Sequence, residues 1–230
     1  MKIAGLQKLT LLDYPEHTAC TVFLWGCNYR CPFCHNAGLV TRACDAGISE
    51  DEFFSFLEKR KGLLDGVCIT GGEPLLHPEL TEFIRKIRGY GYRVKLDTNG
   101  TDPGRLSALL AEGLLDMVAM DIKNSPEKYP LTAGTEHCGI SAVNESIKIL
   151  MRGAVAYEFR TTIVRDYHTT EDLRQIGAWI RGARAYYLQR FQDSGDLIGE
   201  GLSACTETEM QKMLEAVLPD VPAAKLRGIG

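Results

Sequence analysis

Short apolar runs alternate with amphipathic helical patterns along most of the 230-residue chain. The apolar runs have the length and composition of strands. The predicted strands cover residues 19–25, 66–70, 92–97, 116–121, 155–164 and 184–190. One predicted helix begins at Ser49, where Glu52 has the spacing of a capping box. The other predicted helices cover residues 78–89, 103–112, 142–151, 170–181 and 206–218.

Strands separated by helices in this order form right-handed βαβ units, which place the strands side by side in a parallel sheet. Six such units are two fewer than a closed eightfold barrel contains. We therefore predict the α/β class, with an open, partial (β/α)6 barrel of the TIM type and a parallel sheet. Residues 1–230 are expected to form a single domain, in which 1–18 are an N-terminal extension, 19–218 the partial barrel and 219–230 a C-terminal tail. Residues 9–15 are predicted to form a short hairpin outside the barrel.

Composition and charge exclude some classes of function. The formal net charge is −4 and the pI is about 5.8, which argues against the broad basic surface of a nucleic-acid-binding protein. The sequence contains no run of eighteen apolar residues, and its N-terminus lacks the apolar core of a signal peptide. We therefore expect a cytoplasmic protein that does not enter a membrane. In a reducing compartment, the eight cysteines favour metal binding over disulfide bonds.

Three of the cysteines, Cys27, Cys31 and Cys34, lie together directly after the first predicted strand. Thiolates at this C-x3-C-x2-C spacing can bind three irons of a [4Fe–4S] cluster and leave the fourth iron without a protein ligand. That iron is then free to bind a small molecule. The alternative is a zinc site, which Cys44, His35 or His17 would complete as the fourth ligand. The spacing favours the cluster.

Polar motifs follow other predicted strands at their carboxyl ends. In parallel α/β folds these ends lie on one rim and carry the reactive groups, so we expect the motifs to meet there with the cysteines. The motifs are Gly71-Gly72-Glu73-Pro74, Asp97-Thr98-Asn99-Gly100, Asp121-Ile122-Lys123 and Gln189-Arg190.

The first of these motifs, Gly71-Gly72-Glu73-Pro74, has the properties of a ligand-binding turn. Its two glycines carry no side chains where the backbone must approach a ligand closely, and Glu73 supplies an acceptor beside them. Such a turn suits a positively charged amino group. The alternative is an ordinary connection from strand to helix, with Pro74 and Pro78 at the entry to the helix.

The cysteine motif, with the aromatic Phe33 before its last cysteine, and Gly-Gly-Glu-Pro at the next strand end together resemble the radical S-adenosylmethionine superfamily. Further motifs resemble the activating enzymes of glycyl radical enzymes: Cys34-His35-Asn36, Leu96 to Gly100, and Met120 to Lys123. The whole chain resembles the activating proteins of anaerobic ribonucleoside-triphosphate reductase. That similarity includes Gly5-Leu6-Gln7-Lys8, Asp13-Tyr14-Pro15, Phe159-Arg160-Thr161-Thr162 and Tyr187-Leu188-Gln189.

This resemblance implies a set of metal and cofactor ligands. Cys27, Cys31 and Cys34 would bind the [4Fe–4S] cluster, and Gly71, Gly72 and Glu73 would hold the methionine amino group of S-adenosylmethionine. Asp97 and Thr98 would lie near the ribose and the methionine carboxylate, and Lys123 would contact that carboxylate. A monovalent cation would bind near Asp97 and Asp121. The remaining candidates for cofactor contacts are Phe33, Arg160 and Gln189.

The resemblance also implies the reaction. Reductive cleavage of S-adenosylmethionine would give a 5′-deoxyadenosyl radical, which abstracts hydrogen from a glycine of a partner glycyl radical enzyme. The implied partner is the anaerobic ribonucleotide reductase, and the implied electron donor is flavodoxin or ferredoxin. One alternative is a radical enzyme that acts on a small molecule or peptide. A second is a non-catalytic metal-binding interaction protein, which the presence of Glu73, Asp97 and Lys123 disfavours.

Overall fold

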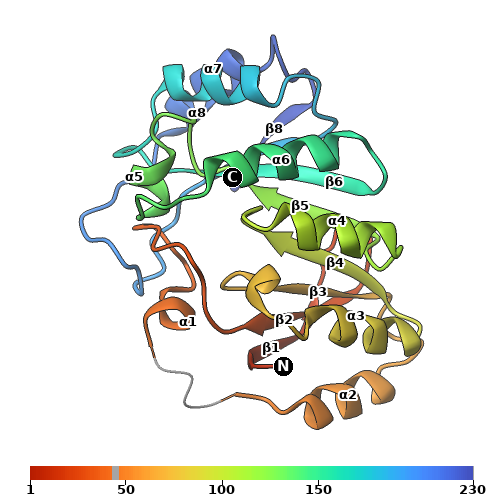
Figure 1. Cartoon of the computed structure of the whole chain (residues 1–230). Helices are drawn as coiled ribbons and strands as arrows, with labels where there is room; N and C mark the ends of the chain where they lie inside the picture. The colour runs from red at the N-terminus through yellow and green to blue at the C-terminus, as the bar shows by residue number, and fades with distance from the viewer. Residues whose placement is uncertain (43–46, 230) are drawn as a thin grey trace.

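The computed structural model describes residues 1–42 and 47–229, and one eight-stranded sheet runs through them (Figure 1). The strands follow one another in sequence order across the sheet, and neighbouring strands from β2 to β8 are parallel. The first strand is antiparallel to the second. The strands are β1 (Ile3–Thr10), β2 (Ala19–Leu24), β3 (Gly66–Gly71), β4 (Arg93–Thr98), β5 (Met117–Asp121), β6 (Ala156–Ile163), β7 (Tyr186–Arg190) and β8 (Ala224–Arg227).

Helices cover the outer face of the curved sheet (Figure 1). This layer contains α2 (Glu50–Lys59), α3 (Leu80–Gly89), α4 (Pro103–Ala111), α6 (Ile140–Met151), α7 (Thr170–Trp179) and α8 (Glu207–Val217). The short helices α1 (Ala37–Thr41) and α5 (Tyr129–Ala133) lie instead at the end of the barrel toward which the parallel strands point. A 3-10 turn, η1 (Pro74–Leu76), follows β3. No helix among the described residues is long and apolar enough to span a membrane.

The local sequence explains where the outer helices begin and which face they bury. Helix α2 begins after Ser49, whose hydroxyl accepts from the Glu52 backbone N–H, and the Glu52 carboxylate accepts from the Ser49 backbone in return. In α3, Phe83 and Ile87 lie one turn apart on its buried face. Phe83 packs against Phe53 of α2 with a ring-centroid distance of 5.3 Å. Burial of each such side chain stabilises the fold by about 1.5–3 kcal/mol.

The predicted open α/β barrel is confirmed, and all six predicted strands form. Two strands were not predicted, because β1 and β8 lie in the segments assigned to an N-terminal extension and a C-terminal tail. The predicted hairpin at residues 9–15 is wrong: β1 continues to Thr10, and the following residues connect it to β2. Strand β1 pairs on one side only and mixes Gly5, Gln7 and Lys8 with apolar residues, so its sequence lacks a strand pattern.

The last strand, β8, is attached through a buried ion pair. The Glu158 carboxylate of β6 accepts two hydrogen bonds from the Arg227 guanidinium, at 3.2 Å and 3.1 Å, across the intervening strand β7. The same guanidinium lies 3.7 Å from the ring centroid of Tyr187 in β7. Glu158 is almost completely buried, whereas the side chain of Arg227 is 35% exposed. The pair therefore connects three strands at the edge of the sheet.

We expect Arg227→Met to lower the free energy of unfolding by about 2–3 kcal/mol, because it leaves the buried Glu158 carboxylate without its bidentate partner. The double variant Glu158→Met/Arg227→Met should lose less than the single variant, because no unpaired charge remains. Urea denaturation monitored by circular dichroism measures both values. Equal stability of Arg227→Met and the parent would show that the pair does not hold β8.

Candidate functional site

A cavity of about 240 Å³ lies at the carboxyl ends of the parallel strands, beside the cysteine loop. It contains every predicted site residue except Glu73, so the motifs do converge on one rim. The predicted residues that line it are Cys27, Cys31, Phe33, Cys34, Gly71, Gly72, Asp97, Thr98, Asp121, Lys123, Arg160 and Gln189. The lining also includes residues outside the predicted set of cluster and cofactor ligands: Tyr29, His35, Asn36, Val40, Thr70, Asn99 and Thr162.

The cysteine loop is held by contacts with distant parts of the chain. The backbone N–H of Arg30 donates to Ala133 O of α5 at 2.9 Å, and the Tyr29 hydroxyl donates to Cys138 O at 2.6 Å. On the other side, the N–H of Gly199 donates to Pro32 O at 2.7 Å. These bonds connect the loop to the segments that follow β5 and β7, so its shape depends on the complete barrel.

The cysteines of this loop are free thiols in a largely buried environment. Burial raises the pKa of Cys31 to about 11 and also raises the pKa of Cys27, although the Tyr29 backbone N–H, which donates to Cys27 Sγ at 3.3 Å, opposes that shift. Iron must therefore displace the protons of the Cys27 and Cys31 thiols when it binds.

Among the described residues, no three His, Cys, Asp or Glu side chains are grouped closely enough to hold a single metal ion. A zinc ion needs all of its ligands around one centre, whereas a [4Fe–4S] cube accepts each thiolate at a different iron. The loop is therefore compatible with the cube. Cys44, which the zinc alternative used, lies outside the described residues.

Both glycines of the Gly71-Gly72 pair are required by contacts with the start of the cysteine loop. A Cβ atom on Gly72 would lie 1.8 Å from Gly26 O, and one on Gly71 would lie 2.4 Å from Leu24 O. Gly71 also has a φ of +121°, which disfavours any side chain. The Asn36 amide donates to Gly71 O at 3.1 Å. The glycines thus allow the end of β3 to pack directly against the loop that carries the thiols.

Glu73 lies beneath the cavity and is completely buried. Its Oε1 accepts from the Leu75 N–H at 3.0 Å and from the Thr98 hydroxyl at 2.7 Å, and its Oε2 accepts from the Asn99 N–H at 2.6 Å. Burial raises the pKa of Glu73 to about 7, against the lowering effect of these donors. Both carboxylate oxygens bind the protein itself, and Glu73 is not among the residues that line the cavity.

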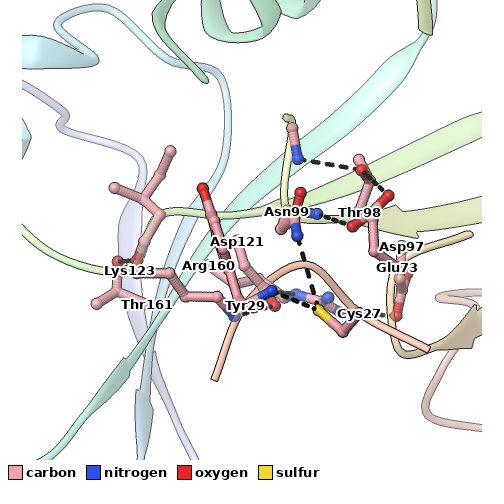
Figure 2. A network of polar contacts seen from close by, with 12 residues as sticks. Cys27, Tyr29, Glu73, Asp97, Thr98, Asn99, Asp121, Lys123, Arg160 and Thr161 are labelled. Atoms are coloured by element: carbon pink, nitrogen blue, oxygen red, sulfur yellow. Dashed lines mark hydrogen bonds and ion pairs between the residues drawn. The ribbon is translucent and has the colours of Figure 1, made fainter. Parts of the chain in front are cut away.

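Asn99 links the Glu73 carboxylate to the cysteine loop (Figure 2). Its backbone N–H bonds Glu73, while its side-chain amide donates to Asn28 Oδ1 at 2.8 Å and contacts Cys27 Sγ at 3.9 Å. The sequence motif contained Asn99, but the sequence does not show which of its groups faces the thiol.

Five charged side chains form a continuous network beside the cavity, and four of them, Asp97, Asp121, Lys123 and Arg160, line it (Figure 2). Arg160 of β6 donates from Nε to Asp121 Oδ1 at 3.0 Å and from Nη1 to Asp97 Oδ2 at 3.1 Å. The other oxygens of these carboxylates are also paired: Lys95 Nζ donates to Asp97 Oδ1, and Lys123 Nζ donates to Asp121 Oδ2 at 2.9 Å. Each carboxylate oxygen therefore has one cationic nitrogen beside it.

The network fixes the charge state of its members. Burial raises the pKa of Asp97 and of Asp121, but the opposing charges outweigh burial and hold both pKa values below the usual range. Arg160 and Lys95 act on Asp97, whereas Lys123 and Arg160 act on Asp121. Burial alone would lower the pKa of Lys123, yet Asp121 raises it above its ordinary value. Asp97, Asp121, Lys123 and Arg160 therefore remain ionised at neutral pH.

Two further residues support the rim and were not predicted to do so. His168 is buried, and its Nε2 lies 2.9 Å from Lys123 O. Its ring also lies edge-on to Phe33, with 6.2 Å between centroids. His35 stacks on Phe191, and its Nε2 lies 2.8 Å from Gln192 O. The sequence alone does not predict that a single histidine will hydrogen-bond a distant backbone carbonyl and so stabilise the rim.

Comparison with known proteins defines the class to which this fold and site belong. The family model "Radical SAM superfamily" matches residues 22–176. A protein of Methanocaldococcus jannaschii, provisionally named a glycyl-radical enzyme activating enzyme, is 30% identical over 217 residues, which are 92% of this chain and 89% of that one. The pyruvate formate-lyase-activating enzyme of Clostridium pasteurianum is 30% identical over 190 residues, 80% of this chain and 77% of that one.

A solved structure shows the same fold. Streptococcus suis SuiB bound to S-adenosylmethionine has a TM-score of 0.68 at 12% identity, over 88% of this chain and 48% of that one. The chain belongs to the radical SAM superfamily and is an enzyme of this type. Membership implies a [4Fe–4S] cluster and S-adenosylmethionine, and the three free thiols beside the cavity fit the cluster.

The position of Glu73 predicts that Glu73→Gln, although isosteric, is not tolerated. The amide NH2 of the glutamine would face an N–H group that now donates to the Glu73 carboxylate, so two donors would oppose each other and one hydrogen bond would be lost. We therefore expect the free energy of unfolding to fall by about 1–3 kcal/mol. Affinity for S-adenosylmethionine should fall as well, because the Thr98-Asn99 turn loses its support. Urea denaturation and equilibrium binding measure these effects, with Glu127→Gln at an exposed position as the control. An unchanged urea midpoint for Glu73→Gln would contradict the positioning role.

Proposed function

We propose that this enzyme activates a glycyl radical enzyme by abstracting hydrogen from a glycine of that partner. The observation that carries the proposal is the similarity, over 92% of the chain, to the M. jannaschii protein, whose name specifies this activity. The similarity to the pyruvate formate-lyase-activating enzyme supports the same class of partner.

In this proposal, Cys27, Cys31 and Cys34 each bind one iron of the cluster. When bound, the cluster with S-adenosylmethionine supplies a one-electron reductive cleavage that gives methionine and a 5′-deoxyadenosyl radical. The chain determines where this chemistry occurs. Its thiols are fixed at the cavity wall by the bonds of the cysteine loop to the segments after β5 and β7.

The cavity offers complementary groups to the ends of S-adenosylmethionine. We assign the backbone at Gly71 and Gly72 to the methionine amino group. Lys123 and Arg160, whose network carries a surplus positive charge, are assigned to the methionine carboxylate. The Glu73 carboxylate positions the Thr98-Asn99 turn beneath the cofactor and does not touch it.

On the remaining walls, Phe33 and Gln189 are assigned to the nucleoside side of the cofactor. Both line the cavity, and they reach it from different parts of the fold, Phe33 from the cysteine loop and Gln189 from β7. Asp97 and Thr98 lie between this region and the glycine turn and are assigned to the ribose.

The partner we propose is the anaerobic ribonucleotide reductase, with flavodoxin or ferredoxin as the electron donor. A glycine on an exposed loop meets the steric requirement, because it has no side chain and tolerates strained backbone angles. The loop must leave its own protein to reach the cavity, so the association is expected to be transient and coupled to local opening of the partner.

The cluster assignment predicts that the anaerobically purified protein contains about four irons and four sulfides per chain. Replacement of Cys27, Cys31 or Cys34 by Ala should remove this content, because each thiolate holds one iron. Cys20→Ala, a buried thiol of β2, is the matched control and should retain the cluster. Iron and sulfide analysis with visible absorption measures the outcome. Stoichiometric zinc without sulfide would contradict the assignment.

The partner assignment predicts a glycine-centred doublet in the electron paramagnetic resonance spectrum. It should appear when the enzyme, S-adenosylmethionine and a reductant are incubated with the anaerobic ribonucleotide reductase of the same organism. Deuterium on the α-carbon of the reactive glycine should then be found in 5′-deoxyadenosine. Success only with another glycyl radical enzyme would correct the partner. Failure with every such enzyme, while the cofactor is still cleaved, would favour a small-molecule or peptide substrate.

A further inference from the structure

The resemblance to glycyl radical activating enzymes implied a monovalent cation near Asp97 and Asp121. The residues in this cavity do not fit such an ion. The Arg160 guanidinium lies between the two carboxylates and donates to both, at 3.1 Å and 3.0 Å. The position that would attract a cation is therefore filled by a cation of the chain itself (Figure 2).

The remaining carboxylate oxygens are engaged as well. Lys95, which is 1% exposed, pairs with Asp97, and Lys123 pairs with Asp121. A free cation that enters this space would have to displace the guanidinium and would then lie close to three positive side chains. Every carboxylate oxygen of Asp97 and Asp121 already has a cationic neighbour, so an added ion would find no free oxygen on either residue, and Glu158, the next carboxylate, is paired with Arg227.

Strand register explains why Arg160 takes this place. Arg160 of β6 is the register partner of Asp121 in β5, and Asp97 of β4 is opposite Ala119 of β5. The small side chain of Ala119 lies between Asp97 and Glu158 across the sheet. It leaves room for the longer Arg160 side chain to extend past Asp121, its register partner, and to reach Asp97. The planar fork of the guanidinium then directs one N–H to each carboxylate, which neither a lysine nor a spherical ion can do.

We propose that Arg160 serves as a built-in replacement for the monovalent cation, so that S-adenosylmethionine binding does not require Na⁺ or K⁺. The five side chains have a formal net charge of +1, and the neighbouring Glu158–Arg227 pair leaves that value unchanged; it is the charge that one carboxylate of the cofactor neutralises. Arg160 therefore has two roles: it fixes Asp97 and Asp121, and it supplies positive charge at the cavity wall for the methionine carboxylate. This inference rests on the proposed function only in that S-adenosylmethionine occupies this cavity.

The test measures equilibrium binding of S-adenosylmethionine to the cluster-loaded enzyme, without reductant or partner. Buffers of equal ionic strength contain choline, sodium or potassium chloride. The dissociation constant of the parent should agree within twofold in the three salts. A parent enzyme that binds the cofactor at least fivefold more tightly in potassium than in choline would overturn the proposal, whatever the behaviour of any variant.

Arg160→Gln provides the reciprocal result. It removes the charge and leaves one oxygen of Asp97 and one of Asp121 unpaired, so affinity in choline should fall at least tenfold. Potassium should recover part of the loss, because an ion can then enter the vacated position. Thallium-205 resonance with thallium(I) nitrate should detect a bound ion in Arg160→Gln and not in the parent. A bound ion in the parent, or parental affinity of Arg160→Gln in choline, would refute the inference.

Two controls separate this role from a purely structural one. Arg165→Gln removes a surface arginine that pairs with Glu209, and it should behave like the parent in all three salts. Arg160→Lys retains the charge and should remain insensitive to potassium, even if it binds the cofactor less tightly. A potassium dependence in Arg160→Lys equal to that of Arg160→Gln would show that the charge of Arg160 is not the determining property. Because no partner is present, failure to activate a glycyl radical enzyme does not affect any of these outcomes.

Discussion

The buried carboxylate of Glu73 holds the site together. Its side chain accepts hydrogen bonds from the end of β4 and from the turn after β3, while its own backbone N–H donates to Gly26 O at 2.8 Å. Asn99 continues the chain of contacts to Cys27 Sγ. One residue thus connects two strand ends to the loop that carries the thiols. A carboxylate in such a place is costly to bury, and the three donors compensate for that cost.

The inner face of the barrel is charged where an ordinary core would be apolar. Strand β4, strand β5 with the residues directly after it, and strand β6 each contribute two charged residues that are two positions apart, so the side chains of each pair face the same side of the sheet. The pairs are Lys95 and Asp97, Asp121 and Lys123, and Glu158 and Arg160. Buried charges are tolerated only when they are paired. Register between the strands supplies that pairing, and Arg227 extends it to β8. The same ladder that supports the barrel therefore also presents positive charge to the cavity.

The alternation of strands and helices was sufficient to predict the open barrel and the convergence of the motifs. It works because helical connections make successive strands parallel, and the carboxyl ends of parallel strands lie on one rim. The edge strands were missed for a physical reason. They pair on one side only, and β8 has just four residues, so neither needs a continuous apolar pattern.

The sequence also could not distinguish residues that touch a ligand from those that hold others in place. Glu73 follows two glycines and looks exposed to a ligand, yet the turn directs it inward to Thr98 and Asn99. The location of Arg160 between two carboxylates depends on register across three strands, which is a long-range property. His168 is likewise buried by contacts with Lys123 and Phe33, which lie more than forty residues away in sequence. The cysteines differ in that their spacing is local, so the sequence alone places them on one loop.

The open seam of the sheet has a mechanical consequence. In the described residues, β1 and β8 are terminal strands that do not pair with each other. A closed barrel can widen only by breaking a ladder of hydrogen bonds, whereas this one can change its curvature while every strand pair stays intact. The sheet is therefore easiest to deform at the gap between its first strand, β1, and its last strand, β8. Widening is opposed at the carboxyl ends of the strands, where the cysteine loop is bonded to the segment after β7 through Pro32–Gly199 and His35–Gln192, so the seam can open more easily at the opposite end.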